Sequence, residues 1–106
     1  MIEGKPNQFT LGVDLGGTKV KSALVDHNGQ ILAVHTHPTH PNKGPTGVIK
    51  DIIICINGCL EKAKQEAQSL GIGVAGQVDS EGVVQFAPNL NWRNVPLREK
   101  LEDQLG

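Results

Sequence analysis

Aromatic side chains are scarce in this chain of 106 residues: Phe9, Phe86 and Trp92 are the only three, and tyrosine is absent. A protein that stacks bases on aromatic rings needs several of them on one surface, so we do not expect a base-stacking surface. The formal net charge of −1 provides no electrostatic attraction toward nucleic acid or an anionic membrane. We therefore expect neither nucleic acid nor a membrane as a partner.

Long apolar runs are also missing. The longest strictly apolar run extends from Ile52 to Ile56, far shorter than a membrane span, and residues 1–8 lack the apolar core of a signal peptide. We expect a cytoplasmic location, with residues 1–8 as a flexible leader. The length leaves room for one small domain, which we assign to residues 9–106.

Only two cysteines occur, Cys55 and Cys59. They lie four residues apart on a predicted helix, where a disulfide would be strained, and two ligands are too few for a metal site. We predict that both are small buried hydrophobic residues. His35, His37 and His40 could suggest a metal site, but they span a strand end and a proline-rich loop, and we expect no carboxylate close by. Solvated or partly packed histidines are the preferred interpretation.

Glycine, in contrast, is abundant, with 13 residues. In the stretch Leu11–Val20, Gly16 and Gly17 separate two apolar runs, which predicts a hairpin with positive φ at both glycines. Backbone N–H groups at such a turn can bind phosphate, aided by the Thr18 hydroxyl and the Lys19 ammonium, while Asp14 could face a nucleotide-bound Mg²⁺. A plain hairpin with solvated polar side chains explains these residues equally well.

Apolar periodicity, together with glycine and proline positions, predicts the order of elements. We expect strands over Phe9–Leu15, Lys19–Asp26 and Ile31–Thr36, a loop over Pro38–Pro45, a helix from Thr46 to about Ser69, a buried strand within Leu70–Gly76, a short strand over Gly82–Phe86, an irregular segment over Pro88–Trp92, and a last helix capped by Asn94. The first three strands would form an antiparallel meander.

The long predicted helix, capped by Thr46, carries one broad apolar stripe. Its apolar members are Val48, Ile49, Ile52, Ile53, Ile56, Leu60, Ala63 and Ala67, and its polar face is Lys50, Asp51, Asn57, Glu61, Lys64 and Gln68. The apolar stripe must cover a sheet, and the meander is the sheet available.

The segment Gly71-x-Gly73-x-x-Gly76 formally matches the dinucleotide fingerprint. That fingerprint needs a strand before it, a helix opening within it and an acidic residue about 20 positions later. Here a helix precedes it, a turn follows it, and the position about 20 residues on is Pro96. We reject a Rossmann interpretation and predict a strand with Ile72 and Val74 inside, whose glycines allow close approach.

Three segments in order resemble the ROK family of repressors and sugar kinases, and particularly its glucokinase-like members. They are Val13-Asp-Leu-Gly-Gly-Thr-Lys-Val20, Gly71-Ile-Gly-Val-Ala-Gly76 and Ala87-Pro-Asn-Leu-Asn-Trp92. The family usually has proline where Ala75 stands. The resemblance implies an α/β chain with the actin-like ATPase (ribonuclease H-like) fold, in which a mixed sheet combines the three-strand meander, a helix and a parallel strand as an incomplete N-terminal lobe.

The same resemblance implies site residues. Asp14, Gly16, Gly17, Thr18 and Lys19 correspond to a loop for the phosphates of ATP, with Asp14 toward Mg²⁺. Gly76, Gln77 and Asn89 correspond to positions near the sugar, although a turn glycine, an exposed turn residue and a loop cap are equally good interpretations.

A ROK kinase would next show the aspartate that acts as general base, and this chain stops before that residue is due. The resemblance thus implies the N-terminal fragment of an ATP-dependent hexose kinase of the glucokinase type, inactive by itself, with ATP and Mg²⁺ as cofactors, a hexose as substrate, and self-association through the open edge of its sheet. The alternatives are a sugar-sensing ROK transcriptional regulator without its DNA-binding part, and a non-enzymatic nucleotide-binding module.

Overall fold

The computed structural model describes residues 8–106. Its elements in chain order are β1 (Thr10–Leu15), β2 (Lys19–Val25), β3 (Ile31–Pro38), the 3₁₀ turn η1 (Pro41–Lys43), α1 (Gly44–Ala63), β4 (Ser69–Val74), β5 (Gln77–Val78), β6 (Val84–Ala87), the 3₁₀ turn η2 (Pro88–Leu90), β7 (Trp92–Val95) and α2 (Leu97–Leu105). The predicted order of three strands, a helix and a further strand is confirmed. The predicted leader lies outside the described residues except for Gln8.

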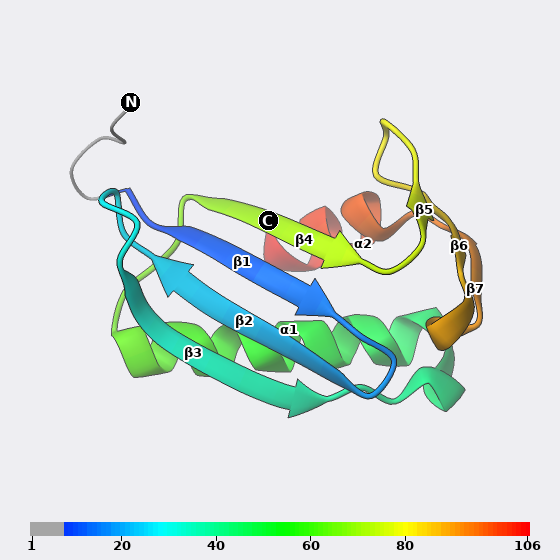
Figure 1. Cartoon of the computed structure of the whole chain (residues 1–106), viewed down its shortest axis with the longest axis horizontal. Helices are drawn as coiled ribbons and strands as arrows, with labels where there is room; N and C mark the ends of the chain where they lie inside the picture. The colour runs from blue at the N-terminus through cyan, green and yellow to red at the C-terminus, as the bar shows by residue number, and fades with distance from the viewer. Residues whose placement is uncertain (1–7) are drawn as a thin grey trace.

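Two sheets organise the molecule. The larger has the strand order β3-β2-β1-β4, with β1, β2 and β3 antiparallel and β4 parallel to β1. The smaller consists of β5, β6 and β7 and lies beyond the C-terminal end of β4 (Figure 1). Helix α1 covers one face of the larger sheet, as its apolar stripe predicts.

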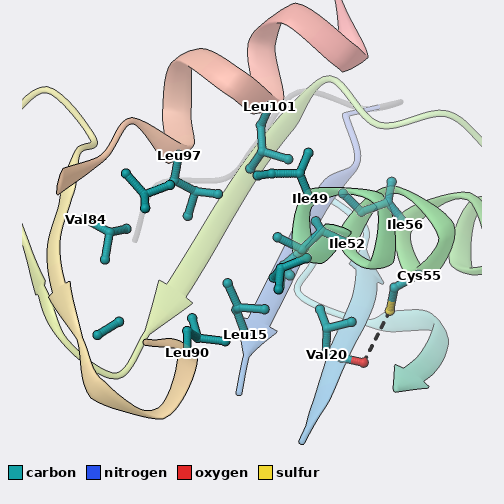
Figure 2. Close-up of a cluster of buried hydrophobic side chains, with 14 of the residues drawn as sticks. Leu15, Val20, Ile49, Ile52, Cys55, Ile56, Val84, Leu90, Leu97 and Leu101 are labelled. Carbon is teal, nitrogen blue, oxygen red and sulfur yellow. Dashed lines mark hydrogen bonds between the residues drawn. The ribbon is translucent and has the colours of Figure 1, made fainter. Parts of the chain in front are cut away.

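Alternation along the strands decides which side chains face α1. In β1, Leu11, Val13 and Leu15 are buried while the residues between them are exposed. Figure 2 shows side chains of the larger sheet, α1, α2 and η2 gathering into one apolar cluster. Cys55 lies at its edge, where its thiol donates to the carbonyl oxygen of Val20 over 3.4 Å. Cys55 and Cys59 are both free and buried, as predicted.

Helix α1 is shorter than predicted at its C-terminal end and begins two residues earlier. Lys64 adopts a left-handed conformation with φ of 52°, and its N–H bonds to carbonyls of the last turn, which ends the helix. At the start, Thr46 is not the N-cap, because η1 leads directly into the first turn and Pro45 occupies one of its opening positions.

The C-terminal region also differs from the prediction. Asn94 does not cap α2 but lies in β7 with φ of 52°, and Pro96 holds the N-cap position. Trp92 begins β7 rather than lying in an irregular segment, and β5 and β7 were not predicted. These strands are too short for an alternation pattern to be recognised in the sequence.

Strand β4 is an edge strand of the larger sheet, pairing with β1 alone among the described residues. Ile72 and Val74 face the core as predicted but are only half-buried. The segment Gly71–Gly76 lies in β4 and the turn after it and opens no helix, so the rejection of a dinucleotide-binding fingerprint agrees with the structure. No helix within residues 8–106 is long and apolar enough to cross a membrane.

Candidate phosphate and sugar site

The turn between β1 and β2 is the hairpin that the sequence predicts. Leu15 pairs with Val20, and the Gly16 N–H donates to the Lys19 carbonyl oxygen over 3.0 Å. The prediction of positive φ at both glycines is wrong, since neither Gly16 nor Gly17 has φ between +20° and +160°. Glycine is required at position 17 for another reason: a Cβ there would lie 2.8 Å from the Asn89 carbonyl oxygen.

This close approach brings three predicted segments together. η2 places Asn89 against Gly17, and Gly76 packs against the backbone of Phe86 and Ala87 at the end of β6. Gln77 follows directly, exposed at the start of β5 and paired with Phe86. The predicted phosphate residues and the predicted sugar residues therefore meet at one end of the larger sheet.

The turn offers backbone donors to a ligand. Within residues 8–106, no hydrogen bond uses the N–H of Gly17 or of Thr18. Free amides at a turn are suited to phosphate oxygens. The Thr18 and Lys19 side chains are exposed and add a hydroxyl and an ammonium next to these amides.

Asp14 lies on the sheet face opposite α1. It is exposed, with Lys21 of β2 on one side in the ladder and Gly73 of β4 on the other. No ion pair in the described part of the chain involves Asp14. Lys19 and Lys21 are both exposed and two residues apart on β2, so they share this face with Asp14.

Lys21 is absent from the sequence-based set of site residues. The sequence contained a pattern that could have identified Lys21, because alternation along a strand puts residues 19 and 21 on one face. Sequence reasoning could not place it opposite Asp14, since the strand register depends on the turn.

The side chains of the described residues alone do not form a complete Mg²⁺ site, but Asp14 could supply one carboxylate ligand. No group of three or more metal-binding side chains is found within residues 8–106. Mg²⁺ is usually held by one or two carboxylates, with phosphate oxygens and water completing its shell. The exposed carboxylate of Asp14, close to the β1–β2 turn, fits that arrangement.

The expectation that no carboxylate lies close to the histidines is wrong for His37 and His40, because packing of α1 against the loop before it brings Asp51 to both. Asp51, expected on the solvent face of the helix, is buried and faces His37 at 3.3 Å and His40 at 3.1 Å. His35 lies apart, with its ring against Gly58. Asp51 lies three residues after Val48 and four before Cys55, so it borders the apolar stripe, and the loop before α1 covers it.

Comparisons with known proteins agree with the fold. The chain is 40% identical to the glucokinase of Streptomyces coelicolor over 99 residues, covering 92% of this chain and 30% of that protein. It is 40% identical to the glucokinase of Thermotoga maritima over 104 residues, covering 95% and 32%. The xylose repressor of Bacillus spizizenii is 27% identical over 110 residues, covering 100% and 28%. The chain thus spans about a third of the length of the curated relatives it matches.

Among solved structures, a ROK glucokinase from Streptomyces griseus in complex with glucose and AMPPNP matches with a TM-score of 0.84 and 38% identity. The match covers 92% of this chain and 30% of that structure. The predicted fold, part of the actin-like ATPase fold of ROK sugar kinases, is thereby confirmed. The ROK family model matches residues 10–106. The chain therefore belongs to the ROK family.

Proposed function

We propose that this chain is the N-terminal part of an ATP-dependent hexose kinase of the glucokinase type, which transfers the γ-phosphoryl group of ATP to a sugar hydroxyl. The observation that carries the proposal is the β1–β2 turn. Its Gly17 and Thr18 amides have no acceptor among residues 8–106, and Asp14, Lys19 and Lys21 share the adjoining sheet face. The similarity to glucokinases across the described chain supports this assignment.

Each residue has a distinct role in the proposal. The Gly17 and Thr18 amides and the Lys19 ammonium bind phosphate oxygens, and Gly16 keeps the turn compact. Asp14 binds Mg²⁺ directly or through a water molecule. When bound, Mg²⁺ neutralises the charge that develops on the phosphoryl group during transfer.

The sugar is proposed to bind near Gly76, Gln77 and Asn89. Gly76 and Asn89 flank the end of β6, and Asn89 contacts the phosphate-binding turn. This brings the acceptor hydroxyl toward the phosphate, as in-line transfer requires. The base that orients the hydroxyl is proposed to lie beyond Gly106, so the 106-residue chain has no turnover of its own.

The exposed β4 edge of the larger sheet indicates where this chain binds other protein segments. α1, α2 and β4 enclose an open groove of about 770 Å³, and β4 offers unpaired backbone groups beside it. We propose that the remainder of the kinase covers this groove, and that the 106-residue chain alone forms homo-oligomers through it. A cytoplasmic location is proposed because the reaction consumes ATP.

A ROK transcriptional regulator is the second candidate, favoured by similarity to a xylose repressor along the whole chain. A non-enzymatic nucleotide-binding module would retain the turn without transfer. Both would lack MgATP-dependent phosphorylation of glucose.

The deciding experiment is Asp14→Ala in the full-length protein. We expect kcat/KM for MgATP-dependent glucose phosphorylation to fall by about 10²-fold or more, because metal-assisted charge stabilisation is lost. Asp26→Ala, at the β2–β3 turn on the opposite end of the same sheet, is the matched control and should retain activity. If Asp14→Ala phosphorylates glucose at the wild-type rate, the assignment of the turn is wrong.

A further inference from the structure

Asp51 is a buried carboxylate with four hydrogen-bonding contacts from outside its helix. The His40 backbone N–H donates to Oδ2 over 2.8 Å, and His40 Nδ1 lies 3.1 Å from both carboxylate oxygens. His37 Nε2 lies 3.3 Å from Oδ1. The cluster of Asp51, His37 and His40 thus joins α1 to the end of β3 and to the loop that follows it.

The same loop contacts the proposed phosphate-binding turn. Thr39, directly before His40, is buried, and its N–H donates to the Thr18 carbonyl oxygen over 2.9 Å. One residue of the loop therefore bonds to the turn while its neighbour bonds to Asp51. Because the two backbone donors are adjacent, the position of His40 restricts the position of Thr39.

The charge of Asp51 matters to these contacts. Burial by itself would raise the pKa of the Asp51 carboxyl, but hydrogen bonds from the His40 backbone and ring, the charge of His40 and the His37 hydrogen bond outweigh it and lower that pKa below its ordinary value of 3.8. Within residues 8–106, His37 and His40 are the only basic side chains paired with Asp51, and no second carboxylate shares the cluster.

We propose that Asp51 is a positioning residue for the β1–β2 turn: it holds His40 and Thr39, and Thr39 holds the Thr18 carbonyl, so that the Gly17 and Thr18 amides keep the orientation that binds phosphate. The ligand of the turn rests on the proposed function above. The coupling from Asp51 to Thr18 rests on the hydrogen bonds alone.

The test is amide hydrogen exchange by NMR on the 106-residue chain. Asp51→Asn keeps the size of the side chain but removes its charge and one acceptor oxygen. We expect the protection factor of the Thr39 N–H to fall about tenfold or more, the Gly17 and Thr18 amide resonances to shift, and protection of Val13 in the core to change less than twofold.

Two further variants keep the test decisive. Asp26→Asn is the matched control, because Asp26 also accepts two backbone N–H bonds in a β-turn of this sheet, and Thr39 should be unaffected. His40→Gln removes only the half-exposed ring and serves if Asp51→Asn does not fold. It should give a smaller loss at Thr39.

Measuring Thr39 protection as a function of pH distinguishes a role of the Asp51 charge in positioning from a role of its side chain in packing. The folded-state pKa of Asp51 is depressed, so its contribution is complete above pH 3.8 and is lost as the pH falls through the lower folded-state value. Thr39 protection in the wild type should follow this loss, and in Asp51→Asn it should not depend on pH over that range. Unchanged Thr39 protection in both Asp51→Asn and His40→Gln, or equal pH profiles for wild type and Asp51→Asn, would overturn the proposal.

Addition of Mg²⁺ and AMPPNP to the same samples distinguishes the two proposals. If the Gly17 and Thr18 amides of the wild type do not respond while Thr39 loses protection in Asp51→Asn, the proposed function fails and the coupling stands. If the wild type responds and Asp51→Asn binds with the same Kd, the positioning role is wrong and the proposed function stands.

Discussion

Individual glycines in this chain differ in what they require, and the difference depends on neighbours far away in the sequence. Gly12 and Gly17 lie five residues apart, yet a Cβ at position 12 would meet no atom of residues 8–106 within 4 Å, whereas one at position 17 would lie 2.8 Å from the Asn89 carbonyl oxygen. The requirement at Gly17 is close packing between the β1–β2 turn and η2, and it does not involve backbone torsion.

This contrast predicts the behaviour of two alanine variants. Gly17→Ala must displace η2 or the turn, so we expect the free energy of unfolding to fall by about 1–3 kcal/mol. Gly12→Ala, on the open face of β1, should leave it unchanged or raise it slightly, because alanine restricts the unfolded chain. Urea denaturation of both variants checks this, and an equal loss for the two would contradict the packing argument.

At the scale of elements, α1 ends where a single residue changes conformation rather than where its apolar pattern stops. The stripe continues in sequence to Ala67, but Lys64 turns left-handed, which lets the chain reverse and enter β4 parallel to β1. A lysine in this conformation is strained by its Cβ, and glycine is not.

We therefore expect Lys64→Gly to stabilise the protein by about 0.5–1 kcal/mol, measured as a higher midpoint in thermal unfolding. Lys50→Gly is the matched control, since Lys50 is exposed inside α1, where glycine costs about 1 kcal/mol. A loss of stability in Lys64→Gly as large as in Lys50→Gly would show that the left-handed cap does not form.

At the scale of the whole molecule, the apolar core is closed on the side of the meander and open beside β4. Leu70 and Ile72 of β4 and Leu101 and Leu105 of α2 line the open groove, and Leu105 is 42% exposed. Apolar surface next to an unpaired strand edge favours association.

We expect the 106-residue chain to self-associate with increasing concentration in sedimentation velocity, and Leu105→Lys to weaken that association at least several-fold. Lysine in the last turn of a helix is also compatible with the helix dipole, so folding should be retained. Leu32→Lys is the control on β3, at the opposite edge, where Leu32 is 44% exposed. If Leu32→Lys weakens the association and Leu105→Lys does not, the chains associate through the β3 edge and the prediction is wrong.

Features that depend on local patterns could be predicted from the amino-acid sequence. Alternation in β1 and β2, the turn glycines and the apolar stripe of α1 predicted the meander, the covering helix and a further strand after it. The resemblance of three short segments to the ROK family implied that this strand is parallel. These patterns are local because the periods of strands and helices are seen among residues that lie close together in the sequence.

Contacts between segments far apart in the sequence could not be predicted, because they depend on the packing of the folded chain. The sequence pattern predicted that Asp51 faces solvent, but the loop through His40 covers it. The pattern also predicted that Gly17 is needed for a positive φ, but the close packing of η2 is what requires glycine there. Lys21 joined Asp14 only through the strand register. Such contacts depend on how the whole chain packs, since a buried carboxylate or a close backbone approach is set by groups far away in the sequence.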